Sequence, residues 1–238
     1  MRDIFGQALL DYHSGNYEED IITYSSVGGE DRLPLPYLFR DYKAMPKIEQ
    51  RALELCQGAV LDIGCGAGNH ALYLQENGLD ITGLDISEGA IETCKLRGLK
   101  KTLYGTIYSV DGMKFDTLLL LMNGIGIAGS LTKLDAFLEQ IKNLLLPGGQ
   151  VLLDSSDIIY MFDDEEIIEN TKTIASVDQY YGQVTFITQY RSQKSTPFDW
   201  LYLDYTTLKE SCKANGFCCE LVMEGEHYDY LARLSVKK

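Results

Sequence analysis

One short segment restricts the possible folds of this chain more than any other. An apolar run at 59–63 leads into three glycines at alternate positions, Gly64, Gly66 and Gly68, and then into a helical pattern. Because glycine has no Cβ, the backbone can turn sharply there and a ligand can lie against it. Such a ligand faces the free amides at the start of the following helix. The segment predicts a buried strand, a ligand-binding turn and a helix.

Short apolar runs alternate with helical patterns from about 47 to 155, which is typical of a mostly parallel sheet with helical crossovers. The last helix of this region is expected to end at a turn made by Pro147, Gly148 and Gly149. The expected strands are 59–63, 80–85, about 100–107, 115–122 and 150–154, and the expected helices are 45–56, 68–77, 87–97 and 131–145.

The flanking segments have a different character. Residues 1–46 are rich in tyrosine and are broken by glycine and proline, so we expect an irregular N-terminal cap. Residues 156–203 are predicted to form a β-rich insertion on the substrate side, and 204–238 a final helix and two strands at the sheet edge. The elements expected after 155 are strands at 171–178, 183–191 and 199–203, a helix at 205–214, and strands at 217–223 and 228–236.

A carboxylate follows the second expected strand. Asp85 closes the apolar run that begins at Ile81, and open α/β sheets bind ligands at the carboxyl ends of their strands. Its lone pairs suit two neighbouring hydroxyls, and its spacing of about twenty residues from the glycine turn is that of ribose recognition. The alternative role is the N-cap of the next helix, which Ser87 could fill equally well.

These features resemble the class I methyltransferases, which use S-adenosylmethionine (SAM) and release S-adenosylhomocysteine. Their first motif has the form (V/L)LD(I/V)GCGxG, and residues 60–68 match it position by position. Dinucleotide-binding enzymes instead carry Gly-x-Gly-x-x-Gly. The resemblance implies one α/β domain over 1–238 with a three-layer, Rossmann-like fold. Its sheet would be seven-stranded and mostly parallel, with an antiparallel C-terminal hairpin. An N-terminal cap and a small β insertion would be added to the SAM-binding core at 47–155.

The resemblance also implies a set of cofactor contacts. Asp62 would order the glycine turn and face the methionine amino group, while Asp85 would hold the ribose and Ile86 would pack on the adenine. The family usually has an acidic residue after the third strand, whereas this chain has Thr106, so an adenine contact and an ordinary strand residue both remain open there. The residues expected to bind SAM are Asp62, Gly64, Cys65, Gly66, Gly68, Asn69, Asp85, Ile86, Thr106, Ile107, Asn123 and Gly124.

The segment 114–126 resembles the family's fourth motif, a buried strand whose carboxyl end delivers residues to the transferring methyl group. Asn123, Gly124 and Ile125 would then line the site, although the glycines could instead relieve crowding in a loop. The motif (D/N)PP(Y/F) of adenine-N6 and related amino methyltransferases is absent, which disfavours those reactions.

Methyl transfer is an in-line displacement at a carbon that the sulfonium already activates, so an enzyme mainly has to position the reactants and exclude water. A hydroxyl or a protonated amine as acceptor would also need a general base near the cleft. Tyr12, His13, Asn123 and Asp154 are the candidates for catalytic roles. We expect His70, which follows the glycine turn, to make packing contacts rather than to act as a base.

The charge balance restricts the acceptor. The 21 basic and 35 acidic residues give a net charge of −14, and the acids are spread along the chain, which argues against binding a phosphate backbone.

The cysteines lack zinc-site spacing, so we expect reduced thiols and no metal. No stretch reaches the roughly 18 apolar residues that span a bilayer. We expect a cytoplasmic protein acting on a small molecule, while the oligomeric state is not indicated.

Two other functions are open at this point. A SAM-binding sensor or interaction module without transfer activity would be expected to carry a damaged first motif, whereas here the carboxylate and the three glycines are intact. A nucleotide-dependent oxidoreductase is disfavoured by the glycine spacing.

Overall fold

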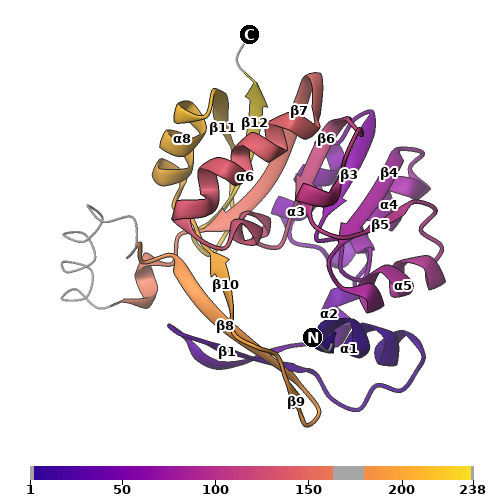
Figure 1. Cartoon of the computed structure of the whole chain (residues 1–238). Helices are drawn as coiled ribbons and strands as arrows, with labels where there is room; N and C mark the ends of the chain where they lie inside the picture. Colours follow the sequence, from indigo (N-terminus) through magenta and orange to yellow (C-terminus); the bar gives the residue numbers. More distant parts are fainter. Residues whose placement is uncertain (1–2, 163–179, 237–238) are drawn as a thin grey trace.

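The computed structural model describes residues 3–162 and 180–236, and a seven-stranded sheet forms its centre (Figure 1). The strand order is β11-β12-β7-β6-β3-β4-β5, and the pairs are parallel except those made by β12. This confirms the predicted three-layer fold with its antiparallel C-terminal hairpin. The strands are β3 (Ala59–Ile63), β4 (Asp80–Asp85), β5 (Thr102–Tyr104), β6 (Phe115–Leu120), β7 (Leu145–Ser156), β11 (Phe217–Glu224) and β12 (Asp229–Val236).

Helices cover both faces of this sheet. Two of them, α6 and α8, pack on one face, and three, α3 to α5, pack on the other. Each helix presents an apolar side to the strands, as the alternating sequence pattern predicts. The helix bounds are α3 (Lys47–Leu55), α4 (Asn69–Glu76), α5 (Glu88–Leu96), α6 (Leu131–Leu144) and α8 (Tyr205–Ala214).

A second, antiparallel sheet lies below the carboxyl ends of the parallel strands in Figure 1. Its order is β10-β8-β1-β2, with the short β9 also paired to β8. The N-terminal cap and the insertion therefore share one sheet, which we call the small sheet. Its strands are β1 (Ile21–Ser25), β2 (Gly29–Leu33), β8 (Gln183–Tyr190), β9 (Gln193–Lys194) and β10 (Phe198–Leu201).

The expectation of an irregular N-terminal cap is wrong. Helix α1 (Ile4–His13) begins where the Asp3 carboxylate accepts a hydrogen bond from the Gly6 amide, and it buries Ala8 and Leu9. The hairpin β1–β2 follows, and then α2 (Leu35–Leu38) and the short helix η1 (Tyr42–Ala44). Tyrosine favours strands, but the partner of β1 is a distant strand that local patterns do not reveal. The strand expected at 171–178 lies outside the described residues.

Two element ends differ from prediction. Strand β5 stops at Tyr104, because Thr106 begins a turn in which its carbonyl accepts hydrogen bonds from the backbone amide and hydroxyl of Ser109. Strand β7 begins at Leu145, directly after α6, rather than at 150. Its pairing with β6 passes from Leu145 to Gln150, so the Pro-Gly-Gly segment bulges from the strand instead of ending the helix.

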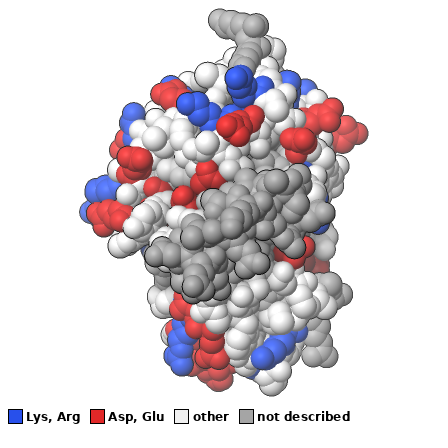
Figure 2. All heavy atoms as spheres, turned by 90° about the vertical axis from the view of Figure 1, so that its left-hand side faces the viewer, with Lys and Arg blue, Asp and Glu red and all other residues white. Residues whose placement is uncertain are grey.

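Charged side chains are scattered over the outer surface. Acidic and basic side chains are interspersed on the face shown in Figure 2, and acidic ones lie both above and below the grey segment. Within residues 3–162 and 180–236, no helix combines the length and the apolar character required to cross a membrane. Nor do these residues contain a group of three or more histidine, cysteine or carboxylate side chains that could hold a metal ion.

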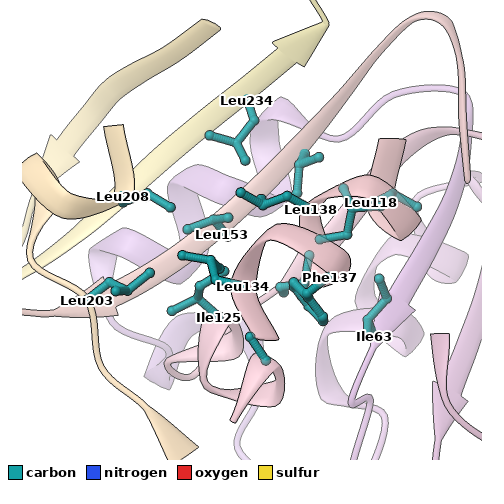
Figure 3. Packing of buried hydrophobic residues seen from close by; sticks show 14 of the residues in the cluster. Ile63, Leu118, Ile125, Leu134, Phe137, Leu138, Leu153, Leu203, Leu208 and Leu234 are labelled. Carbon is teal, nitrogen blue, oxygen red and sulfur yellow. The ribbon is translucent and has the colours of Figure 1, made fainter. Parts of the chain in front are cut away.

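The core between the large sheet and α6 fixes the strand ends from which the site is built. Figure 3 shows Leu118 of β6 and Leu153 of β7 facing Leu134 and Phe137 of α6, and all four side chains are buried. Successive strand residues point to opposite faces. Leu119 and Leu152 accordingly belong to the cluster on the other face.

Candidate active site

The glycine turn presents bare main chain at the carboxyl end of β3. Gly64, Gly66 and Gly68 have φ angles of +78°, +53° and +83°, which residues other than glycine rarely adopt. The amides of Gly64 and Cys65 both donate to the carbonyl of Leu84, at 2.8 and 3.0 Å, so β4 anchors the turn. Among the described residues, a Cβ placed on Gly66 would have only the Phe5 ring within 4.0 Å. The space above Gly66 is therefore open to a ligand.

Asp85 ties the glycine turn to the next strand. Its carboxylate accepts hydrogen bonds from the amides of Gly66, at 2.9 Å, and Ser87, at 2.8 Å. The Ser87 hydroxyl caps α5 by accepting from the Ala90 amide, so the N-cap role belongs to Ser87 rather than to Asp85. Ile86 beside it is 68% exposed. The carboxyl end of β4 thus combines a fixed carboxylate with an exposed apolar side chain.

Asp62 lies beneath the turn with an unused acceptor. Its side chain is buried, and its Oδ2 atom has no hydrogen-bond partner among the described residues. Burial raises the pKa of Asp62 to about 6, although the nearby His70 opposes this effect. A buried acceptor without a partner is costly, so a cationic ligand group that reaches it directly or through water would stabilise this site.

A buried charge network lies behind the turn, and sequence analysis did not identify it. Glu49 of α3 pairs with Arg40, and its other contact is His70 Nε2 of α4, at 2.9 Å. Burial alone would raise the pKa of Glu49, but His70 and Arg40 outweigh it and hold the pKa below its ordinary value. The guanidinium of Arg40 also lies 3.8 Å from the ring centre of Tyr37. His70 thus contacts Glu49 behind the turn, a partner that sequence analysis did not predict.

The loop after β6 is held by Asp154 and Asn123. Met122 and Asn123 have φ angles of +63° and +59°, and the Asp154 carboxylate accepts hydrogen bonds from the amides of Met122 and Gly124, both at 3.1 Å. The Asn123 amide oxygen accepts from the Ser155 hydroxyl at 3.0 Å. Burial raises the pKa of Asp154 to about 7. These two side chains fix the shape of the strand-end loop.

We expect these two carboxylates to make stability depend on pH. Both pKa values are raised in the folded state, to about 6 for Asp62 and about 7 for Asp154, whereas unfolded aspartates titrate near about 4. Between these limits the folded state binds more protons, so the free energy of unfolding falls as the pH rises from about 4 to about 7. Urea unfolding at about pH 5 and about pH 8 measures the fall.

Asp62→Asn should reduce this fall in the free energy of unfolding. The matched control is Asp80→Asn, which removes a surface acid at the start of β4 and should leave the fall unchanged. Glu49 does not disturb the comparison, because its lowered pKa keeps it ionised over this range. The same pH dependence in both variants would contradict the assignment to Asp62.

The other residues predicted to bind SAM differ in burial and in their side-chain contacts. Cys65 is buried with its Sγ 3.8 Å from that of Cys94, and Ile107 is a core residue, so for these two only main-chain atoms could meet a ligand. The Asn69 side chain accepts a hydrogen bond from Arg97 at 2.7 Å. Thr106 is exposed after β5.

The structure brings Asn123 and Asp154 together, whereas Tyr12 and His13 lie at the end of α1. Tyr12 packs against the Phe39 ring with a centroid distance of 4.5 Å, and His13 is exposed. Neither makes a contact with the loop after β6 within the part of the chain that the structure describes. Phe5, near Gly66, was not predicted, because a helix in the N-terminal region was not expected.

A cavity of about 330 Å³ lies between the small sheet and the carboxyl end of β7. Ser156, the last residue of β7, lines the cavity. Its amide donates a hydrogen bond to the Asn123 side chain at 3.3 Å. The helix η3 (Gly124–Ala128) follows Asn123, and Ile127 in it lies 3.0 Å from where a Cβ on Gly64 would be. The loop and η3 thus connect the glycine turn to Ser156 in the cavity lining.

The known proteins that this chain resembles agree with this geometry. Residues 60–149 match the family model of a methyltransferase domain. A crystal structure of a SAM-dependent methyltransferase from Bacteroides fragilis in complex with S-adenosyl-L-homocysteine is 42% identical to this chain. The match covers 99% of this chain and 95% of that one, with a TM-score of 0.90. None of the curated proteins matches at a significant level.

Two more distant structures share the fold. The SAM-bound amino pentose methyltransferase from Micromonospora echinaspora is 15% identical, with a TM-score of 0.55, and the match covers 80% of this chain and 89% of that one. A sugar N-methyltransferase from a Streptoalloteichus species is also 15% identical, with a TM-score of 0.56 and coverage of 84% and 90%.

A Rossmann-like sheet with this glycine turn and an acidic residue after the second strand defines a class I methyltransferase. The chain belongs to the SAM-dependent methyltransferases. It is an enzyme whose cofactor and methyl donor is SAM, and whose cofactor product is S-adenosylhomocysteine.

Proposed function

We propose that this enzyme transfers the methyl group of SAM to a small molecule bound under the small sheet. The cavity carries this proposal, because about 330 Å³ is the size of a small-ligand pocket and Ser156 in its lining donates a hydrogen bond to Asn123 in the loop that also lies against the glycine turn. The net charge of −14 opposes binding of a nucleic acid backbone. A small acceptor therefore fits both the volume and the charge.

For the cofactor, we propose that the main chain of Gly64, Gly66 and Gly68 lies against the methionine and ribose portions. The unpartnered Oδ2 of Asp62 suits the methionine ammonium group. Asp85 already accepts two amide hydrogens, and its remaining lone pairs suit ribose hydroxyls. The exposed Ile86 provides an apolar surface for the adenine. These roles use the orphaned acceptor, the open space and the exposed side chain that the structure contains.

The bound cofactor would supply a methyl carbon that its sulfonium activates toward an attacking lone pair. The residues around it then act mainly by positioning. Asp154 and Asn123 hold the loop after β6 and so set one border of the cleft. The small sheet covers the acceptor side and limits the entry of water. Asn123 and Asp154 are therefore positioning residues in this proposal.

Binding and transfer are tested separately. Trp200, the only tryptophan, lies against Gly126 of η3, so its fluorescence can report SAM and S-adenosylhomocysteine binding, with calorimetry as the second measurement. Pools of small molecules are then incubated with SAM carrying a deuterated methyl group, and products are identified by mass spectrometry. We expect a labelled small molecule. Label that enters only nucleic acid or protein, when these are supplied in parallel, would overturn the small-acceptor proposal.

The Asp85→Ala variant tests the ribose contact. We expect SAM binding to weaken by about 1 to 3 kcal/mol, because buried hydroxyls lose a charged partner and the Gly66 amide loses its acceptor. Calorimetry measures the change. Glu88→Gln, which removes an exposed charge three residues away on α5, is the control and should bind SAM normally. Equal affinities for Asp85→Ala and the unaltered chain would reject the contact.

A further inference from the structure

We propose that the methyl acceptor is a small molecule with a basic aliphatic amine, which the cavity under the small sheet holds as a cation. The inference rests on the proposed function, since it assumes that this cavity is the acceptor site. It adds a chemical class to the acceptor, and four features of the cavity support it.

The first feature is the charge of the lining. Glu30 and Asp31 of β2 line the cavity, and its described lining residues include no lysine, arginine or histidine. Among the described residues neither acid forms an ion pair, and Asp31 accepts a hydrogen bond from the adjacent Arg32 amide, at 2.7 Å. The described lining therefore carries two carboxylates and no basic side chain, which favours a cationic ligand.

The second feature is the aromatic wall. Phe186 and Tyr202 line the cavity together with Tyr160, which is 55% exposed. Within the described part of the chain, no lysine or arginine lies over these three rings. The small sheet's own cations lie over other rings, as with Lys194, 4.1 Å from the centre of Tyr24. Tyr160 stacks on Tyr228 and Phe186 on Phe198, so each of these two rings has one face left that can attract an ammonium group.

The third feature is the lack of groups that other acceptors need. A carboxylate or phosphate acceptor would meet two carboxylates and no cation. A basic amine needs no cation in the lining, and it can lose its proton to water at the open mouth of the cavity before it attacks.

The fourth feature is the direction in which positive charge moves during methyl transfer. The neutral amine nitrogen attacks the methyl carbon, the C–S bond breaks, and its electron pair stays on sulfur. The positive charge therefore leaves the sulfonium and appears on the methylated nitrogen, which later releases a proton to water. Carboxylates on the acceptor side favour this movement. The missing (D/N)PP(Y/F) motif does not oppose it, because an aliphatic amine has no lone pair delocalised into an aromatic ring.

The test uses choline as a cationic probe and, as its partner, the neutral compound with carbon in place of the choline nitrogen. Choline has no lone pair on nitrogen, so its binding is measured without turnover, by calorimetry on the full chain saturated with S-adenosylhomocysteine. We expect choline to bind about tenfold more tightly than the neutral compound. The Glu30→Gln/Asp31→Asn double variant should lose this preference.

The control is Glu139→Gln/Glu210→Gln, which removes two exposed charges on α6 and α8 outside the cavity and should keep the preference. Equal affinity for the two probes, no binding of choline, or equal losses in both double variants would overturn the amine proposal. A failure to bind S-adenosylhomocysteine, seen first by Trp200 fluorescence, would instead count against the cofactor assignments.

Transfer is compared with matched amines and alcohols of the same carbon skeleton. Methylation of the amines but not of the alcohols is the expected result. Methylation of the alcohols alone would reject the amine class while leaving the small-molecule methyltransferase intact.

Discussion

The Gly66→Val variant is expected to bind SAM at least about 1,000-fold more weakly than the unaltered chain, a loss of about 4 kcal/mol. A valine side chain at this position would enter the open space above the turn, where the Phe5 ring, at 4.0 Å, is the only neighbour of the new Cβ. The φ angle of +53° also disfavours a β-branched residue. Calorimetric titration with SAM measures the loss.

Gly112→Val is the matched control for backbone strain. Gly112 has a φ angle of +69°, and a Cβ placed on it would have no neighbour within 4 Å. It precedes the amino end of β6, away from the glycine turn. Both variants should lose similar stability in thermal unfolding, while only Gly66→Val loses SAM. Normal affinity in Gly66→Val would refute the close approach of the cofactor to this backbone.

Removal of the Glu49 carboxylate should destabilise the protein by about 3 to 5 kcal/mol, because Arg40 is then left buried without a counter-charge. The side chains of Arg40 and Glu49 are each only 4% exposed, so water cannot replace the lost partner. Urea unfolding of Glu49→Ala measures the change. The control is Glu54→Ala on the same helix, whose pairing with Arg51 is about half exposed and should contribute less than about 1 kcal/mol.

A double variant separates the unpaired charge from the lost volume. Arg40→Met with Glu49→Leu replaces both ions by apolar side chains and should recover most of the stability that Glu49→Ala loses. If Glu49→Ala is no more destabilising than Glu54→Ala, the network does not hold the N-terminal region against α3 and α4.

Local patterns were sufficient to predict the large sheet and the glycine turn. The strand at 59–63, the three glycines and Asp85 are neighbours in one repeating unit, and their chemistry can be inferred from short windows of sequence. The network of Arg40, Glu49 and His70 could not be inferred in this way, because its members come from three separate elements. Each taken alone looks like an ordinary polar residue.

Long-range strand pairing and side-chain direction explain the other features that sequence analysis did not predict. Tyr24 pairs with Ile187 across the small sheet, and neither strand carries a signal that specifies the other. Cys65 and Ile107 were assigned to the cofactor from their motif positions, but side-chain direction depends on how the turn packs on α5 and how the chain leaves β5. The sequence pattern therefore predicted the glycine turn at the carboxyl end of β3 but not the small sheet.

The small sheet joins an early hairpin to strands made more than 150 residues later, as the pairing of Ser25 with Phe186 illustrates. During synthesis on the ribosome, the glycine turn and its neighbouring strands emerge well before β8 can reach β1. The nascent chain can thus form the glycine turn before the small sheet is complete.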